Sequence, residues 1–388
     1  MRLFLFVFFT LYGGLHVYAF IRARAAFAFG TGISLLLALF MAFMTAAPVL
    51  TRITEKQGYE KAAQILAYTG YTWMGVLFLF CSLSALIDLS RLLVAAGGYV
   101  LRKDLAGLYV PGRPAFLLSL SLSLLISLYG YLEAREIRME RIVLISPKIP
   151  EEAGTITIAQ ISDVHLGLIV REERLQRILA LVKSANPDIL VSTGDLVDGQ
   201  IARLNGLAAL LQEIRAPRGK FAVPGNHEYY AGIDQALAFT REAGFTILRG
   251  DAVTGVITLA GVDDPAAEAF GLFRDVPEKE LLSALPREKF TVLLKHRPFV
   301  DRNAVGLFDL QLSGHTHKGQ IFPFSLLTGA YYALKAGTIQ AGYAELPGNS
   351  WLYVSRGAGT WGPPLRFLAP PEVTIIELVH GKRGAPLP

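Results

Sequence analysis

Four stretches within the first 132 residues contain no Lys, Arg, Asp or Glu, and they constrain the fold more than any other feature. They cover residues 3–21, 25–51, 62–87 and 114–132. Each approaches or exceeds the ~20 residues that an α-helix needs to cross ~30 Å of hydrocarbon at ~1.5 Å per residue. A buried helix in a soluble core is the alternative, and such uncharged length disfavours it. We therefore predict an all-α bundle of four transmembrane helices over residues 1–134.

The first of these stretches follows Arg2 and could be taken for a secretory signal peptide. Its apolar run is longer than the ~7 to 15 residues usual in a signal peptide. A second apolar run also follows it at once. We therefore expect a helix that stays in the membrane.

The net charge of +5 is divided unequally along the chain. Residues 1–150 contain 14 Lys and Arg against 7 Asp and Glu, a net charge of +7, whereas residues 151–388 contain 23 against 25, a net charge of −2. The basic excess belongs to the membrane part, so no nucleic-acid partner is expected for the remainder. Eight Lys and Arg flank the side of the bundle that holds both its ends, against six on the other side. The positive-inside rule then predicts a multi-pass protein of the inner, cytoplasmic membrane with a cytoplasmic C-terminal domain.

From about residue 150, short apolar runs alternate with amphipathic helical patterns, which is typical of layered α/β proteins. We assign residues 151–388 to this domain and residues 135–150 to a juxtamembrane linker. The charged segment 133–141 is expected to prolong the fourth helix, with its arginines at anionic headgroups. The single cysteine, Cys81, excludes a disulfide framework. Strands are predicted over residues 155–162, 188–193, 221–224, 256–262, 291–295, 310–313, 351–355 and 373–378, and helices over 171–185, 202–214 and 233–243.

Polar side chains follow five of the predicted strands at the point where each strand ends. Open α/β sheets bind their ligands at the carboxyl ends of strands. Five of the seven histidines are in these clusters, although a single histidine in such a place is most often structural. Eight polar groups at one edge would be costly to desolvate without a ligand. The clustered residues are Asp163, His165, Asp195, Asn226, His227, His296, His315 and His317.

These side chains offer imidazole, carboxylate and amide ligands and no thiolate. Such a set suits Mn, Fe or Zn in a catalytic site better than a structural Cys-rich zinc site or a soft copper site. Eight groups are too many for one ion and suit two. We therefore expect two divalent metal ions at this edge.

The motifs DVH, GDLVD, GNHE, a later lone His and GHTH occur in this order, and together they resemble the signature of the calcineurin-like metallophosphoesterase superfamily. The resemblance runs from about residue 155 to 378. The phrases ISDVHLG, NPDILVSTGDLVDG and LSGHTHKGQ are similar to membrane-associated bacterial members, among them enzymes that act on UDP-diacylglucosamine and a related group with several N-terminal membrane spans. The resemblance implies an α/β fold of the α+β type, a four-layer β-sandwich flanked by helices, preceded here by the transmembrane bundle.

The resemblance also implies a role for each clustered residue. His227 would stand near the leaving group without binding metal, and Asp195 would bridge two metal ions, with Mn favoured. One ion would be held by Asp163, His165 and His317, and the other by Asn226, His296 and His315.

The expected chemistry follows from these positions. Two cations roughly 3.5 to 4 Å apart can share a water, lower its pKa toward neutral and direct it at phosphorus. His227 is expected to protonate the departing oxygen, with Asp163 orienting its ring. Asp198 is equally consistent with tuning the site and with a turn after the strand, and Glu228 is expected to hold the GNHE loop through hydrogen bonds.

Two cationic residues beside the motifs are candidates for substrate binding. Lys318 could pair with a substrate phosphate or the second charge of a diphosphate, and a solvated loop lysine is an equal alternative. Arg297, next to His296, has the same two interpretations. Asp263 and Asp264 are expected to cap a turn rather than bind a ligand.

Two later segments could border the site. Residues 322–343 are rich in aromatic residues and leucine, which fits either an apolar wall for a lipid tail or ordinary core. The segment with Trp361 and Arg366 is expected to close the site from its C-terminal side.

We therefore interpret the chain as a membrane-anchored dimetal phosphoesterase or pyrophosphatase whose partners are membrane lipids and a lipid-linked phosphate substrate. One alternative is a phosphodiesterase for a soluble nucleotide or another small phosphodiester, with the helices as anchor or sensor. A second is a non-catalytic membrane protein that binds or senses, which the complete set of expected ligands disfavours. The sequence leaves the oligomeric state open.

Overall fold

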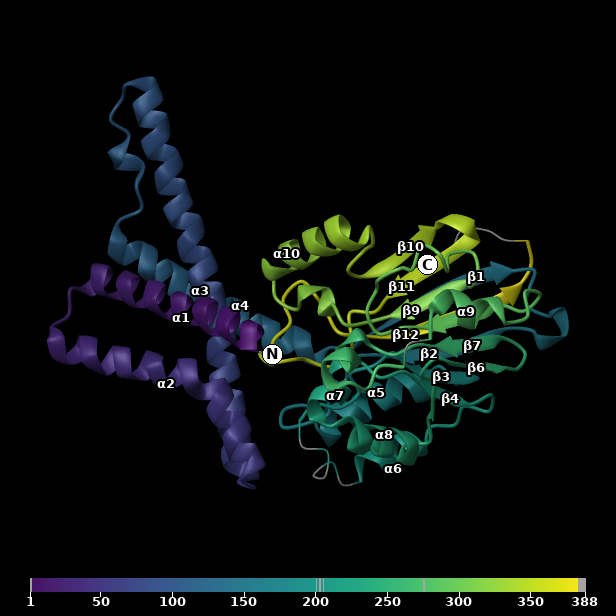
Figure 1. Cartoon of the computed structure of the whole chain (residues 1–388). Coiled ribbons are helices and arrows are strands. Elements are labelled where there is room, and N and C mark those ends of the chain that lie inside the picture. Colours follow the sequence, from purple (N-terminus) through teal and green to yellow (C-terminus); the bar gives the residue numbers. More distant parts are fainter. Residues whose placement is uncertain (1, 200, 202–203, 205, 275, 383–388) are drawn as a thin grey trace. The chain divides into compact units, whose positions relative to one another are not determined.

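The computed structural model describes residues 2–199, 201, 204, 206–274 and 276–382 (Figure 1). The chain divides into two compact units. The helical unit contains the residues up to Leu132 together with Gly362–Leu365, and the catalytic unit contains Glu133–Trp361 and the residues from Arg366 onward.

The helical unit is built from four long helices, as the uncharged stretches predict. All four are long and apolar enough to cross a membrane. At ~1.5 Å per residue, the 42 residues of α3 extend ~63 Å, about twice the hydrocarbon thickness of a bilayer. The helices are α1 (Arg2–Phe27), α2 (Thr31–Lys56), α3 (Glu60–Leu101) and α4 (Gly112–Arg135), with a short 3-10 turn, η1 (Ala106–Leu108), before α4.

Small residues and buried hydrogen bonds join the first three helices. A Cβ atom on Gly70 of α3 would lie 2.8 Å from the Cβ of Ala47 in α2, so this glycine allows the two helices to approach closely. The indole N–H of Trp73 in α3 donates to Nε2 of His16 in α1 over 2.9 Å. Packing and interhelical hydrogen bonds drive helix association where lipid removes the hydrophobic driving force.

The catalytic unit contains two six-stranded sheets. The first sheet is parallel from β2 to β5, and β12 joins it antiparallel to β2. Its strand order is β1 (Arg138–Ser146), β12 (Glu372–His380), β2 (Ile156–Ile161), β3 (Ile189–Ser192), β4 (Lys220–Ala222) and β5 (Thr246–Ile247). The second order is β10 (Gly342–Leu346), β11 (Ser350–Val354), β9 (Leu310–Ser313), β8 (Thr291–Leu294), β7 (Thr258–Gly261) and β6 (Asp251–Thr254).

The two sheets pack face to face and helices cover their outer faces. One apolar cluster takes side chains from both sheets, such as Ile158 and Val292, and therefore forms the layer between them. A second cluster joins the first sheet to α5 (Glu172–Ser184), α6 (Leu207–Gln212) and α8 (Ile233–Glu242). A third joins the second sheet to α9 (Glu278–Ser283). These layers confirm the predicted four-layer sandwich flanked by helices.

The strands and helices have the expected sequence patterns. All four residues of β3 are buried, as in strands covered on both faces. In α5 the buried residues Leu175, Ile178, Leu179 and Val182 recur at helical spacing and face the sheet. The helix expected over residues 202–214 is α6, and residues 202, 203 and 205 of that range lie outside the described residues.

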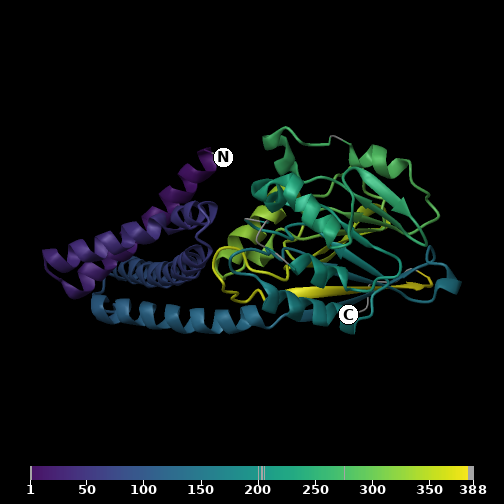
Figure 2. The ribbon, with the colours of Figure 1, turned by 90° about the horizontal axis from the view of Figure 1, so that it is seen from below.

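The charged segment after the fourth helix differs from expectation. The helix α4 ends at Arg135, and residues 138–146, expected partly as helix and within a linker, form β1. This strand runs parallel to β12, the long yellow strand near the C-terminus in Figure 2. Arg141 forms a 2.8 Å ion pair with Glu377 of β12. Arg135 likewise pairs with Glu173 of α5 over 2.8 Å. The expectation of a helical linker was wrong because long-range strand pairing satisfies this segment's backbone and charges.

Candidate metal centre

The sequence motifs meet at one edge of the two sheets. Asp163 and His165 follow β2, Asp195 follows β3, and Asn226 begins α7 (Asn226–Ala231) after β4. His296 follows β8, and His315 and His317 follow β9. Because β2, β3 and β4 are parallel in one sheet and β8 and β9 in the other, their carboxyl ends bring these loops together.

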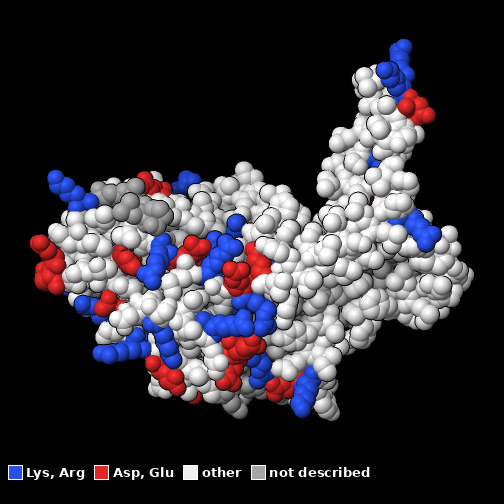
Figure 3. Space-filling model, turned by 180° about the vertical axis from the view of Figure 1, so that it is seen from behind, with Lys and Arg blue, Asp and Glu red and all other residues white. Residues whose placement is uncertain are grey.

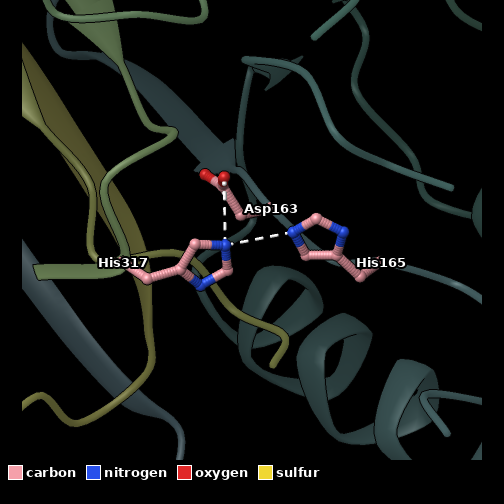
Figure 4. A group of neighbouring side chains, drawn as sticks. All are labelled: Asp163, His165 and His317. Carbon is pink, nitrogen blue, oxygen red and sulfur yellow. Dashed lines mark hydrogen bonds and ion pairs between the residues drawn. The ribbon is translucent and has the colours of Figure 1, made fainter. Parts of the chain in front are cut away.

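The first cluster contains Asp163, His165 and His317 (Figure 4). Nε2 of His165 lies 3.0 Å from Nε2 of His317, which in turn lies 3.4 Å from Oδ1 of Asp163. Burial lowers the pKa of His165 to about 3, so its ring is neutral and carries a free lone pair. Two imidazole nitrogens and a carboxylate oxygen directed at one another fit a divalent cation between them.

The second cluster is formed around His296. Its Nε2 lies 3.1 Å from Nδ1 of His315 and 3.2 Å from Oδ1 of Asn226. Its Nδ1–H donates to the Thr193 carbonyl over 2.8 Å, which orients the ring and leaves Nε2 for a ligand. Burial opposes a charged ring, but the carboxylates of Asp195 and Asp163 raise the pKa of His296 to about 10. A proton and a metal ion therefore compete for the same nitrogen.

Asp195 lies between the two clusters. Its Oδ2 is 3.2 Å from Nε2 of His296 in one cluster and 3.9 Å from Nε2 of His165 in the other. Although burial favours the protonated acid, the nearby His296 and His227 hold the pKa of Asp195 well below its usual value. One ionised carboxylate thus faces both clusters.

The backbone of the loops is bent to direct these side chains inward. Non-glycine residues with positive φ are uncommon, and they gather at functional sites. Gly314 directly precedes His315, and a Cβ atom there would lie 1.9 Å from Oγ of Ser162, so no larger residue fits. Positive φ angles occur at Asp163 (51°), His165 (55°), Asp195 (53°), His315 (71°) and His317 (48°).

Glu228 ties two of these loops together. Its buried carboxylate accepts hydrogen bonds from the backbone N–H groups of Asp195, Leu196 and Gly225 at 3.0, 2.7 and 2.7 Å. Burial and the neighbouring Asp195 raise its pKa to about 7. The expectation that Glu228 holds the GNHE loop through hydrogen bonds is confirmed.

His227 stands beside the clusters and is paired with Asp198. Its Nδ1 lies 3.1 Å from Oδ1 of Asp198. Burial opposes the charged ring, but Asp195 and Asp198 raise its pKa to about 9. Asp163, expected to orient His227, instead accepts hydrogen bonds from Ser162 and from the N–H of His315. Asp198 takes the orienting position, because the turn after β3 brings its carboxylate to the ring.

The two candidate substrate-binding cations are placed differently. Arg297 forms two hydrogen bonds with the buried Asp264, at 2.8 and 3.0 Å, so its guanidinium is held in place beside His296. Asp264 also accepts from the N–H of Ala266, which confirms the expected turn cap. Lys318 lies in the loop of the last ligands and is partly exposed.

Sequence reasoning did not assign a contact to Arg366, which lies fully buried behind the first cluster. Its Nη2 is 2.9 Å from Nδ1 of His317. The same guanidinium donates to the carbonyl oxygens of Arg356 and Gly359, so it ties the loop that contains His317 to the segment after β11. No local motif marks this arginine, because its partners lie in other loops.

Comparisons with known proteins agree with this geometry. The calcineurin-like phosphoesterase family matches residues 156–319. An uncharacterized metallophosphoesterase of Aquifex aeolicus is 41% identical over 260 residues, which cover 66% of this chain and 97% of that protein.

Two further relatives are matched over part of their length. An uncharacterized metallophosphoesterase of Helicobacter pylori is 38% identical, over 58% of this chain and 60% of its own. A transmembrane protein with a metallophosphoesterase domain from Danio rerio is 30% identical, over 67% of this chain and 62% of its own. The chain thus spans less than two thirds of these two relatives. From the matched residues and the convergent ligand clusters, the chain belongs to the calcineurin-like metallophosphoesterase family of metal-dependent phosphoester hydrolases.

Proposed function

We propose that this protein is a membrane-anchored phosphoesterase with two divalent metal ions, Mn favoured, that hydrolyses a phosphoester or pyrophosphate bond of a lipid-linked substrate. The observation that carries the proposal is the pair of ligand clusters on either side of Asp195, with the paired His227 beside them. Four helices able to span a membrane in the same chain support a substrate that is itself held in the bilayer.

Two groups of side chains would hold the metal ions. Asp195 would contact both, since its Oδ2 faces each group. Bound there, two divalent ions supply electrophilic activation of the phosphoryl group and a hydroxide at neutral pH. The remaining ligands would be Asp163, His165 and His317 for one ion and Asn226, His296 and His315 for the other.

The protein's own residues would then manage the proton and the substrate. Asp198 engages Nδ1 of His227, so Nε2 is the ring atom left to donate a proton to the leaving oxygen. Lys318, partly exposed in the last ligand loop, would pair with a substrate phosphate. Arg297, fixed by Asp264, would offer a second positive charge with little loss of side-chain freedom on binding.

We further place the protein in the inner membrane with the metal centre on the cytoplasmic side. The excess of Lys and Arg on the side of the bundle that holds both its ends supports this orientation. Membrane lipids are then its immediate surroundings, and no nucleic-acid partner is proposed.

Hydrolysis by the full-length protein in mixed micelles tests the proposal. Phosphatidate, diacylglycerol pyrophosphate and UDP-diacylglucosamine would be compared with soluble bis(p-nitrophenyl) phosphate and nucleotides, with Mn²⁺ and after chelation. We expect metal-dependent turnover that favours a lipid-linked substrate. A preference for soluble substrates that is indifferent to detergent would overturn the lipid part, and no hydrolysis of any substrate by metal-loaded protein would overturn the whole.

A matched pair of variants separates chemistry from folding. His227→Ala removes the proposed acid, whereas Asp234→Ala changes an exposed carboxylate of α8 on the same unit. The first is expected to lose turnover and the second to retain it. Equal turnover in both would contradict the role given to His227.

A further inference from the structure

An apolar helix lies exposed at the edge of the catalytic unit (Figure 1). This helix, α10 (Phe324–Tyr331), has no buried residue, and a π-helical turn (Tyr332–Ala336) follows it. Leu326, Leu327 and Leu334 are 62%, 65% and 85% exposed. We define the α10 surface as Phe322, Phe324, Leu326, Leu327, Tyr331 and Leu334, all of which are exposed.

The α10 surface is unlike the water-facing helices of the same unit. Residues 322–336 contain no Asp or Glu, and their single cation is Lys335, which is exposed. In α5 and α8, by contrast, charged residues occupy the face opposite the core. Single exposed apolar residues are ordinary, but six together mark an interaction surface. The alternative of ordinary core for residues 322–343 is therefore wrong for this helix.

The α10 surface is firmly attached to the loop of the last two metal ligands. The hydroxyl of Thr316, between His315 and His317, donates to the carbonyl of Gln340. The hydroxyl of Thr328 in α10 donates to Oε1 of Gln340 over 2.6 Å. A Cβ atom on Gly319 would lie 2.5 Å from Cα of Ser325, so the loop and the helix are in direct backbone contact.

An exposed tryptophan beside His227 is tied to Gln320, which lies in the loop that leads into α10. The backbone N–H of Trp361 donates to Oε1 of Gln320, and Nε2 of Gln320 donates to the carbonyl of Trp361, at 3.0 and 2.9 Å. The indole ring of Trp361 lies 5.6 Å from the ring of His227. Trp361 is 47% exposed, so it offers an apolar ring to a substrate beside the proposed acid.

The short connection between α4 and β1 keeps the catalytic unit close to a bilayer. Only two residues, 136 and 137, separate the end of α4 from the start of β1. At ~3.3–3.6 Å per residue they allow a separation of about 10 Å. Since α4 has the length and composition of a membrane span, the catalytic unit remains at the bilayer that holds this helix.

We propose that the α10 surface inserts into the interfacial layer of that bilayer, where it brings lipid-linked substrate to the metal centre; the substrate part rests on the proposed function. The leucine side chains would enter the acyl region, and the rings of Tyr331 and Trp361 would lie at headgroup level. Lys335 would meet the phosphates of anionic lipids. A second copy of this chain could also cover the surface, and the experiment distinguishes the two.

Fluorescence quenching in the full-length protein tests the insertion without relying on activity. Cys81→Ser leaves no native cysteine, because the chain has only one. Leu334→Cys then takes an environment-sensitive probe at a site so exposed that folding is not disturbed, and Glu288→Cys takes it on an exposed polar loop of the same unit. Both proteins would be reconstituted in phosphatidylglycerol-containing vesicles with nitroxide-labelled acyl chains.

We expect nitroxide lipids to quench the probe at position 334 and to leave the probe at position 288 unchanged. Equal, weak quenching at both positions would overturn the proposal. A blue-shifted probe at position 334 that is unquenched by lipid but sensitive to protein density would show a second copy in place of the bilayer, and would also overturn it.

A paired substitution tests substrate delivery. Leu327→Gln with Leu334→Gln makes the surface polar without touching the metal loops. We expect the ratio of turnover on vesicle-embedded substrate to turnover on soluble bis(p-nitrophenyl) phosphate to fall roughly tenfold, since two apolar anchors leave the bilayer. If nitroxide lipids quench the probe of the Leu334→Cys protein but the parent protein hydrolyses no lipid substrate, the insertion is supported and the lipid-linked substrate is rejected. An unchanged ratio would reject delivery by this surface.

Discussion

The two units of this protein distribute polar and apolar side chains in opposite ways. Figure 3 shows Lys, Arg, Asp and Glu spread over the catalytic unit and few on the helical unit. The helices expose leucines such as Leu36 and Leu93, whereas the catalytic unit buries Asp163 and Asp195 completely or almost so. Lipid accepts the first arrangement without cost. Buried charges are costly unless they are paired or bind a metal ion, so the second arrangement indicates a site.

Each unit also contains an exception to its own distribution of polar and apolar side chains. The helical unit buries His16, which accepts a hydrogen bond from Trp73. The catalytic unit exposes the apolar α10 surface. His16 and Trp73 satisfy each other inside the bundle, whereas every residue of α10 is at least partly exposed. The comparison therefore predicts that substitutions among the clustered residues of the catalytic unit affect metal and turnover, and that those in the helical unit affect stability alone.

The largest effect is expected from the carboxylate that faces both ligand clusters. Asp195→Asn removes the charge shared by the two clusters, so both metal sites should weaken. We expect bound metal to fall well below that of the parent and turnover to fall by more than the ~10–100-fold that follows loss of a ligand's supporting partner. Metal analysis and hydrolysis assays on the full-length protein would measure both, with exposed Asp234→Asn as the control. Full metal content in Asp195→Asn would contradict the bridging role.

The next effect separates the proton donor from the metal ligands. His227→Ala should keep both metal ions and lose roughly 10²–10⁴-fold in turnover, the usual contribution of a positioned acid. Asp198→Asn keeps the ring but removes its negatively charged partner, so a smaller loss is expected. Metal analysis of both variants should match the parent. If the two variants lost metal as readily as Asp195→Asn, His227 would belong with the ligands.

A smaller effect is expected where the loops are tied. Glu228→Ala would leave the N–H groups of Asp195, Leu196 and Gly225 unsatisfied in a buried place. Loss of such hydrogen bonds to a charged group should cost about 3 kcal/mol. At ~2–4 °C per kcal/mol, Tm should therefore fall by roughly 6–12 °C. Thermal unfolding in detergent would measure it, with Glu242→Ala at the exposed end of α8 as the matched control. An unchanged Tm would show that the hydrogen bonds of Glu228 do not stabilise these loops.

The smallest effect is expected inside the helical unit. Trp73→Phe keeps the ring packed on α1 but removes the hydrogen bond to His16. Interhelical hydrogen bonds of this kind contribute about 0.6 kcal/mol, so Tm should fall by only about 1–2 °C. Turnover on soluble substrate should match the parent. A loss of turnover as large as that of His227→Ala would break the separation between the two units.

Local sequence patterns were sufficient to predict much of the secondary structure and most of the candidate metal ligands. The absence of charge over ~20 residues identifies a membrane helix, because each such helix satisfies its own backbone hydrogen bonds. Apolar runs likewise identified β2, β3, β4, β8, β9, β11 and β12, and the polar residues that follow β2, β3, β4, β8 and β9 identified the candidate ligands. The position of these residues could also be predicted, because a residue directly after a buried parallel strand lies at the carboxyl edge of the sheet.

What only the tertiary structure decided lies in contacts between distant segments. Strand β1 pairs with β12, so that Arg138 faces Glu372, and no pattern within residues 133–150 shows that partner. His227 is oriented by Asp198 and not by Asp163, which depends on how two loops pass each other. Arg366 supports His317 from 49 residues away, and α10 is exposed although its sequence also suits a core. The sequence by itself determined the four apolar helices, the strands that precede the clustered residues and the types of candidate metal ligand, because these depend on local hydrophobicity and on side-chain chemistry. Strand pairing, contacts between loops and the exposure of a helix depend on which distant segments meet, and only the folded chain determines this.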